Sequence, residues 1–425
     1  MSNTHWKAIR LDEFCDLVLD CVNKTAPTVE YDTGFKMIRT TNVKDGYVSL
    51  HGVRHVTSEV YEKWTRRGRP KSGDVIMTRE APLGEVGLLR DATGVFLGQR
   101  LVMYRSNPNT NEPKFLLYAL MGQELQSQIK AYGSGSTVEH MRVPDCSALL
   151  IKTPPLPTQK KIASILSAYD DLIENNNRRI KILEEMAQNI YREWFVHFRY
   201  PGHEDVPLVD SELGQIPQGW EVKRLGDVLR TLESGRRPKG GASNNPYGVP
   251  SIGAENVIGL GQYDFSKEKY VSQDFFEAMN SGVVNENDVL LYKDGAQIGR
   301  KTLFRKGFPH QTCCVNEHVF ILRAKDECSQ LFMYLWLDQP TLTEQIRQLN
   351  SNSAQPGINR DGVKGLPILL PTSAVLELFS SAAEPLIDQI FVCTIQNQNL
   401  RKTRDLLLPK LISGQLDVEE LDIKV

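Results

Sequence analysis

The sequence predicts an α+β fold in which two similar globular domains are separated by two long helices that form an antiparallel coiled coil. Three observations lead to this prediction: a motif pattern that repeats once, a heptad pattern after each copy, and short strand-like runs within each copy. The chain has 425 residues, of which 40% are hydrophobic and 24% charged, so it can bury two full cores.

The repeat is visible in WKAIRLDEF, which begins at Trp6, and WEVKRLGDV, which begins at Trp220, 214 residues later. Further pairs at this spacing are Asn42-Val43 with Asn256-Val257 and Asp74-Val75 with Asp288-Val289. Later motifs lie up to 217 residues apart, as loop insertions would produce. A unit of about 215 residues is far longer than a solenoid repeat, so each copy has the size of a domain. The chain is therefore an internal tandem repeat.

Each copy contains short runs that are typical of β-strands. Examples are VIMTR and GVFLGQRLVMYR in the first copy and DVLLY and HVFILR in the second, with Gly, Pro and Asn between them. Helical segments such as FLLYALMGQELQSQIKAY follow the strands. Strands and helices that occupy separate stretches favour an α+β arrangement within each copy.

The first long helix is predicted after PPLP and should end at Phe198, before RYPGHEDVP. Its seam residues alternate at spacings of four and three, which is typical of a coiled coil rather than of the broader stripe on a surface helix. The seam consists of Ile162, Leu166, Tyr169, Ile173, Asn176, Ile180, Leu183, Ala187 and Ile190.

The second long helix carries a similar but less regular seam, which includes Phe379, Leu386, Ile390, Leu400 and Leu407. Pro385, Asn397 and Arg404 interrupt its apolar character. Two helices that each need a partner most simply pair with each other. Each follows its own domain, so antiparallel pairing would place the domains at opposite ends. Asn176 and Asn397 are expected to set the register of the pair.

These patterns together predict six segments. They are domain 1 at residues 1–156, a central helix at 157–200, a linker at 201–219, domain 2 at 220–371, a C-terminal helix at 372–412 and a polar tail at 413–425.

Composition and motifs exclude several functions. The net charge of −2 argues against nucleic-acid binding by bulk electrostatics alone. The seven Cys are scattered without a C-x-x-C pair, so neither a zinc site nor a disulfide framework is expected. Phosphate-binding, dinucleotide-binding and H-E-x-x-H motifs are missing, so we expect no enzyme, metal or cofactor on this chain. With no signal peptide and no long apolar run, the cytoplasm is the expected location and a membrane is not.

Several strings carry a resemblance to a known family: YREWF, FRYPG, LGQIPQGW and the terminal LLLPKLISGQLDV. The chain resembles the specificity (S) subunits of type I restriction–modification systems over nearly its whole length. This resemblance implies two target recognition domains that each bind half of a split site in double-stranded DNA. It also implies two adenine-N6 methyltransferase (M) subunits docked on the helices, and motor/nuclease (R) subunits. S-adenosylmethionine and ATP with Mg²⁺ would be bound by those partners.

Basic and polar loop residues are the candidates for DNA contact. Two dense basic stretches, RRGRPK and GRRPKGG, contribute Arg66, Arg67, Arg69, Lys71, Arg236, Arg237 and Lys239. Arg79 and Lys293 are aligned across the repeat, each shortly after an Asp-Val pair. The aligned polar loops GSGSTVEHMR and NSNSAQPGINR add Arg142, Asn359 and Arg360. A solvated loop explains each basic stretch equally well.

Two alternatives stay open at this point. The first is a subunit of a fused or type IIB-like restriction–methylation enzyme, against which the missing catalytic motifs argue. The second is a coiled-coil scaffold that does not bind DNA.

Overall fold

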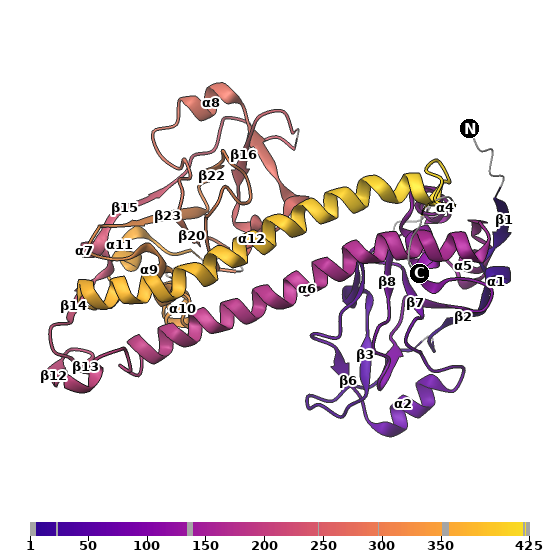
Figure 1. Cartoon of the computed structure of the whole chain (residues 1–425), viewed down its shortest axis with the longest axis horizontal. Helices are drawn as coiled ribbons and strands as arrows, with labels where there is room; N and C mark the ends of the chain where they lie inside the picture. The colour runs from indigo at the N-terminus through magenta and orange to yellow at the C-terminus, as the bar shows by residue number, and fades with distance from the viewer. Residues whose placement is uncertain are drawn as a thin grey trace. The chain divides into compact units, whose positions relative to one another are not determined.

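The computed structural model describes residues 6–22, 24–133, 139–244, 246–295, 297–350, 357–419 and 421 (Figure 1). The chain folds as two compact units, one formed by residues 1–173 with 399–425 and the other by residues 174–398. Each unit contains one globular domain and a part of each long helix. The C-terminal part of the second helix therefore packs with the first domain, as the predicted antiparallel pairing requires.

Domain 1 runs from β1 to β11. Its strands are β1 (Lys7–Arg10), β2 (Cys15–Asp20), β3 (Lys36–Ile38), β4 (Val43–Lys44), β5 (Gly46–Val48), β6 (Arg54–His55), β7 (Val75–Arg79), β8 (Leu83–Leu88), β9 (Val95–Leu97), β10 (Leu101–Ser106) and β11 (Leu150–Thr153). Its helices are α1 (Leu11–Phe14), η1 (Thr40–Asn42), α2 (Ser58–Thr65), α3 (Pro113–Met121), α4 (Gln123–Gly133) and α5 (Val143–Ala148).

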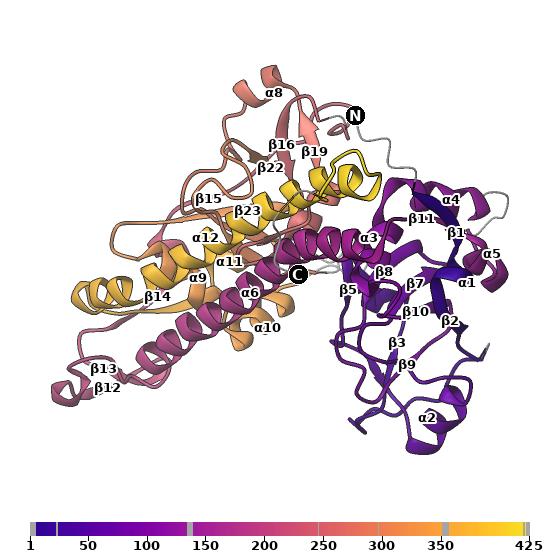
Figure 2. The same ribbon diagram turned by 45° about the vertical axis from the view of Figure 1, so that its right-hand side comes forward.

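The main sheet of domain 1 has the strand order β2-β10-β7-β8-β5-β4, and a smaller sheet has the order β6-β3-β9. Figure 2 shows α2 beside β3 and β9 of the smaller sheet. β10 pairs antiparallel with β2 and β7, and its Leu101–Tyr104 stretch is fully buried. One face of the main sheet is covered by the apolar helix α3.

Domain 2 runs from β14 to β24. Its strands are β14 (Glu221–Arg224), β15 (Leu229–Ser234), β16 (Val249–Ile252), β17 (Val257–Gly259), β18 (Gln262–Tyr263), β19 (Lys269–Val271), β20 (Val289–Tyr292), β21 (Lys301–Leu303), β22 (Cys314–Val315), β23 (Val319–Ala324) and β24 (Pro367–Leu370). Its helices are α7 (Leu225–Val228), η3 (Ala254–Asn256), η4 (Phe265–Lys267), α8 (Gln273–Glu277), α9 (Gln330–Leu337), α10 (Pro340–Gln348) and α11 (Arg360–Lys364).

The sheets of domain 2 repeat those of domain 1. The order β15-β23-β20-β21 matches β2-β10-β7-β8, and β19-β16-β22 matches β6-β3-β9. The terminal pairs correspond as well, since β1 pairs antiparallel with β11 and β14 pairs antiparallel with β24. The predicted α+β fold and tandem repeat are thus confirmed.

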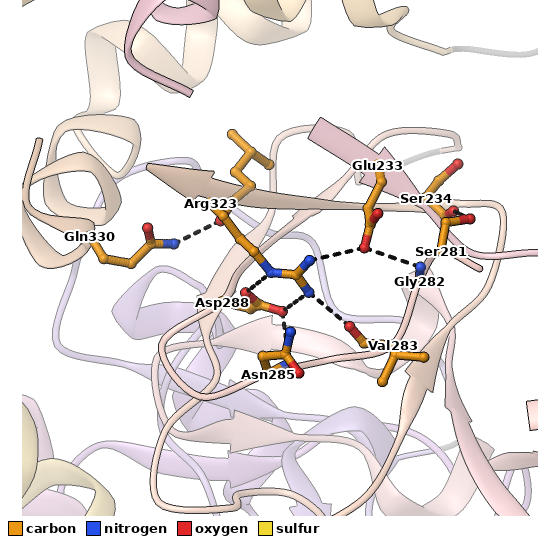
Figure 3. A network of polar contacts seen from close by, with 10 residues as sticks. Glu233, Ser234, Ser281, Gly282, Val283, Asn285, Asp288, Arg323 and Gln330 are labelled. Atoms are coloured by element: carbon orange, nitrogen blue, oxygen red, sulfur yellow. Dashed lines mark hydrogen bonds and ion pairs between the residues drawn. The ribbon is translucent and has the colours of Figure 1, made fainter. Parts of the chain in front are cut away.

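A buried carboxylate–guanidinium pair stands at the same place in both domains. Arg105 donates from Nε and Nη2 to Asp74 at 2.7 and 2.6 Å. Arg323 donates to Asp288 in the same two-pronged manner at 2.6 and 2.7 Å, and Glu233 accepts from its third nitrogen (Figure 3). The aspartates found by sequence alignment of the repeat are therefore structural, because each accepts two hydrogen bonds from a guanidinium and neutralises its charge.

The segment between the two domains contains η2 (His203–Asp205) and a hairpin of β12 (Leu208–Ser211) and β13 (Gly214–Pro217). It follows α6 (Leu156–Phe195), which ends three residues before the predicted Phe198. The reason is local: the backbone at Phe198 has a φ of 58°, in the left-handed region, which a helix cannot continue through.

In each unit, a part of α6 lies alongside an oppositely directed part of α12 (Ser373–Ile412), coloured magenta and yellow in Figure 1. In the first unit, Ile162 and Leu166 join the core of domain 1 together with Leu411. A buried ion pair extends this contact, because Arg404 donates to Asp170 at 2.6 Å. Tyr118 also donates to Asp170, at 2.6 Å. The arginine that interrupts the seam therefore has a partner on the facing helix.

In the second unit, the two seam asparagines contact each other, since Asn176 Nδ2 donates to Asn397 Oδ1 at 3.0 Å. The seam continues through Ile180, Ala187 and Phe379. Here the helices also bury Tyr191, Phe195, Ile387 and Phe391, which lie outside the predicted seam. The expected narrow stripe was wrong for this part, because the helices pack against domain 2 as well as against each other.

Helix α12 is long and apolar enough to cross a membrane when judged by length and composition alone. Its Phe379, Ala383, Ile387, Ile390 and Phe391 are, however, fully buried in the core of the second unit. A core helix of a globular protein passes the same test. The packing explains the apolar composition without a membrane.

Candidate DNA interface

In domain 1, the structure gathers charged side chains at the end of β7. Arg79 donates to the carbonyl of Met141 at 3.0 Å, and its Nη2 lies 3.9 Å from Asp20. Arg67, from the loop after α2, donates to the same Asp20 at 2.8 Å. Next to Arg79, the carboxylate of Glu80 lies 3.4 Å from Arg100 and 3.3 Å from His140. We call Asp20, Arg67, Arg79, Glu80, Arg100 and His140 cluster 1.

Domain 2 has a corresponding group after β20. Lys293 Nζ donates to Asp294 at 2.6 Å and lies 5.2 Å from the centre of the Phe320 ring. His318 Nδ1 lies 3.2 Å from Asp294, while its Nε2 lies 3.5 Å from Glu317. Arg237 lies 3.8 Å from Glu317. We call Arg237, Lys293, Asp294, Glu317 and His318 cluster 2.

The backbone shows that the two clusters occupy equivalent places. Arg79 accepts a hydrogen bond from Met141 N at 3.0 Å, and Lys293 accepts one from Ile358 N at 2.9 Å. Isolated bridges also join Glu80 to His140 and Asp294 to Gly357. In both domains, the second polar loop is therefore attached to the end of the same strand, which brings two predicted sequence features together.

A basic stretch reaches each cluster by a different route. In domain 1 it is the loop between α2 and β7, and in domain 2 it is the loop between β15 and β16. The second loop is anchored at Gly235, where a Cβ would lie 1.5 Å from the Val315 carbonyl oxygen. Only glycine fits there, and this close approach places Arg237 beside Glu317.

The remaining predicted residues lie around the clusters without joining them. Arg69 pairs with Glu62 and packs over the Tyr61 ring. Arg142 is 75% exposed and pairs with Asp145, and Asn359 occupies the matching position as the cap of α11, where it accepts from Gly362 N. The others are exposed: Arg66, Lys71, Arg236, Lys239 and Arg360. The central parts of the two polar loops, residues 134–138 and 351–356, lie outside the described residues.

Sequence reasoning found four cations of the clusters, Arg67, Arg79, Arg237 and Lys293, but missed Arg100 and all of the acids and histidines. Asp20, Glu80, Arg100, His140, Asp294, Glu317 and His318 were not predicted. One signal was available, because Glu80 and Asp294 are 214 residues apart, the spacing of the repeat. Each cluster also contains a buried polar atom that has no hydrogen-bond partner among the described residues, Arg79 Nε in cluster 1 and Glu317 Oε2 in cluster 2. Such unused hydrogen-bonding capacity needs an explanation.

The chemistry of the clusters suits recognition rather than catalysis. Arginine and lysine donate to guanine edges and to phosphates, and carboxylates accept from the amino group of cytosine. Over the described ranges, no group of three or more His, Cys, Asp or Glu side chains is arranged to hold a metal ion. All seven cysteines are buried, and burial raises the pKa of Cys21 to about 11 and that of Cys146 to about 12. Thiols with such pKa values are poor nucleophiles.

A second polar group links domain 2 to α6. Lys301 is buried and donates to the carbonyl of Leu337 and to Thr343, with Asp338 3.5 Å away. Gln188 of α6 donates to Asp338 at 3.1 Å. Burial raises the pKa of nearby Glu184 to about 7, and the Asp338 and Glu185 carboxylates add to the rise. Since the ammonium group caps the C-terminal end of α9, this group is structural.

Comparison with known proteins places these features in a family. Residues 3–185 and 217–375 each match the type I restriction modification DNA specificity domain. The chain is 26% identical over 376 residues to the type I restriction enzyme MjaIX specificity subunit of Methanocaldococcus jannaschii, which covers 88% of this chain and 84% of that protein. It is 23% identical over 415 residues to the HindI specificity subunit of Haemophilus influenzae, which covers 81% of this chain and 87% of that protein.

A solved structure agrees on the fold. The S subunit of a type I restriction–modification system from M. genitalium has a TM-score of 0.55 to this chain at 16% identity, over 97% of each chain.

Two copies of a DNA specificity domain, each followed by one of two paired helices, define a protein that recognises DNA sequence. The chain belongs to the DNA specificity subunits of type I restriction–modification systems. This family is non-catalytic. Membership also removes the alternative of a coiled-coil scaffold without DNA.

Proposed function

We propose that this chain gives a type I restriction–modification complex its target sequence by binding an asymmetric, two-part site in double-stranded DNA. Domain 1 binds one half of the site and domain 2 binds the other. The observation that carries the proposal is the equivalence of clusters 1 and 2. They stand at the same strand end in each domain, yet their residues differ, so the two half-sites should differ as well.

The two long helices connect domain 1 with domain 2. We propose that they separate the half-sites and dock two methyltransferase subunits, to which restriction subunits then bind. S-adenosylmethionine and ATP with Mg²⁺ are bound by those partners and not by this chain, and the complex acts in the cytoplasm. The net charge of −2 fits this division, because partners must then supply much of the phosphate neutralisation.

The test is to produce the chain with and without its methyltransferase partner and to sequence the methylated adenines in the DNA of the host cell. The complex should methylate a motif of two defined parts that are separated by unspecified bases. The chain alone should methylate nothing. Methylation by the chain alone, or a continuous motif from the complex, would contradict the proposal.

A further inference from the structure

A carboxylate has been kept at the same point of both domains. Glu80 and Asp294 each directly follow the strand-end cation, each bridges to the second polar loop, and each contacts a histidine. The surrounding loops and the cations beside them differ. A carboxylate in a DNA-binding surface is repelled by phosphates, so its retention in both domains needs a reason beyond charge balance.

Each of the two carboxylates keeps acceptor capacity that could be used by a bound ligand. In cluster 2, Lys293 and His318 both approach Asp294 Oδ2, and Oδ1 has no partner among the residues that the structure describes. The Asp294 side chain is 31% exposed. In cluster 1, Glu80 is 20% exposed, and its contacts to Arg100 and His140 are long, at 3.4 and 3.3 Å. Neither carboxylate is therefore fully used within its own domain.

The neighbouring side chains hold these carboxylates in a defined orientation. Lys293 is held over the Phe320 ring, and His318 is fixed by a backbone hydrogen bond from its N–H to Asn316 at 2.9 Å. Lys293 and Arg100 lower the electrostatic cost of placing Asp294 and Glu80 close to DNA. The contacts of each carboxylate also fix the direction of its acceptor oxygens. Among the bases, cytosine presents an amino donor in the major groove, for which aspartate and glutamate are the matching acceptors.

We propose that Asp294 and Glu80 are specificity-determining residues that each accept a hydrogen bond from the exocyclic amino group of a cytosine, one in each half-site. The inference rests on the proposed function, since it names the chemical group that each domain recognises. Lys293, His318, Arg100 and His140 act as positioning residues for the two carboxylates. Each half-site then contains at least one C·G pair whose cytosine is recognised by the carboxylate of the corresponding domain.

The test uses the complete complex with its methyltransferase subunits and duplex DNA that carries the motif found in host DNA. Each cytosine of the second half-site is replaced in turn by 2-pyrimidinone, which lacks only the amino group. With the wild-type complex, one replacement should lower the methylation rate about tenfold, the loss expected for one charge-assisted hydrogen bond. With Asp294→Asn, the same replacement should change the rate less than twofold. Glu80→Gln should give the same pattern in the first half-site.

Asp326→Asn is the matched control, because Asp326 is an exposed carboxylate of the same domain outside cluster 2. It should keep the full effect of the 2-pyrimidinone replacement. The proposal is overturned if no replacement in the second half-site lowers the wild-type rate, a result that does not depend on any variant folding. It is also overturned if Asp294→Asn lowers methylation of all sequences equally, as a purely structural ion pair would. Failure of the wild-type complex to methylate a two-part motif would instead contradict the proposed function itself.

Discussion

The two domains share buried polar contacts within their sheets and differ in the charged side chains at the strand end. Asn42 and Asn256 are buried at equivalent places, and each accepts from a backbone N–H three residues earlier. The ion pairs of Asp74 and Asp288 are also equivalent. In contrast, the cation beside the strand end is Arg79 in domain 1 and Lys293 in domain 2.

This difference distinguishes the buried residues that stabilise each domain from the cluster residues that are proposed to contact DNA. A buried polar group is costly to alter, because removing one partner leaves the other unsatisfied. An exposed loop carries no such penalty and can change with the DNA sequence that it contacts. The repeat thus keeps one scaffold while it allows two unequal half-sites.

The largest effect is expected from the shared ion pairs. Asp288→Ala leaves the guanidinium of Arg323 without its main partner and should destabilise domain 2 by about 3–5 kcal/mol. Asp74→Ala should have a similar effect on domain 1. Thermal unfolding of the whole chain measures the loss, and hydrogen exchange locates it. Asp326→Ala, at an exposed site, should stay within about 0.5 kcal/mol of wild type. If both variants lose less than about 1 kcal/mol in the free energy of unfolding, the two ion pairs do not stabilise the domains as proposed.

The next effect compares the helix contacts of the two units. Asp170→Ala in the first unit removes the acceptor of Tyr118 and the buried partner of Arg404, which keeps only its contact with the exposed Asp405, and should cost about 3 kcal/mol. In the second unit, Asn176→Leu together with Asn397→Leu should be neutral or stabilising, but should permit other helix registers. Unfolding experiments and the oligomeric state in solution check both results. If Asp170→Ala and the double asparagine variant lower the free energy of unfolding equally, the ionic contact of the first unit and the amide contact of the second unit do not differ in their effect on stability.

A smaller effect concerns a feature that only domain 2 has. Lys301 corresponds to Val86 in the repeat, because Leu291 pairs with Lys301 as Met77 pairs with Val86. The polar group around Asp338 and Glu184 therefore has no matching lysine in domain 1. Because folding raises the pKa of Glu184 from 4.5 to about 7, the protonated form is favoured in the folded state. Its contribution to stability is complete below about pH 4.5 and is lost as the pH rises through about 7.

Glu184→Gln should therefore stabilise the chain by about 1–2 kcal/mol at pH 8 and have little effect near pH 4.5. Unfolding measured as a function of pH tests this expectation. A difference between variant and wild type that does not change with pH would show that the Glu184 carboxyl does not titrate in this range.

The smallest effect concerns the basic loops. Arg67→Ala and Arg237→Ala should weaken DNA binding by the complex equally for all sequences and reduce the salt dependence by about one phosphate contact. Binding at several salt concentrations, with specific and unrelated DNA, measures both properties. A change in the methylated motif would instead make these arginines base-reading residues.

Much of the fold follows from the sequence, because the repeat and the heptads have regular spacing. The strands at VIMTR and HVFILR, and the facing asparagines of the helices, could be predicted in this way. The wider buried stripe with Tyr191 and Phe391 could not, since it depends on which helix face meets domain 2.

The candidate site was only half predictable. Arg67 could be selected because it lies in a dense basic stretch, and Arg79 and Lys293 could be selected because they are aligned across the repeat. Asp20 and Glu317 could not, because a single acidic residue has no recognisable pattern until the fold places a cation beside it. The acidic residues that hold each basic loop at the strand end could therefore be identified only from the structure.

The central claim is that the two domains recognise separate half-sites independently. It is tested most directly by replacing residues 7–153 with the corresponding domain of another specificity subunit of this family and sequencing the adenines that the resulting complex methylates. The account predicts that one half of the motif changes to that of the donor, while the other half stays as in the wild type. An active complex in which both halves change, or in which neither does, would contradict it.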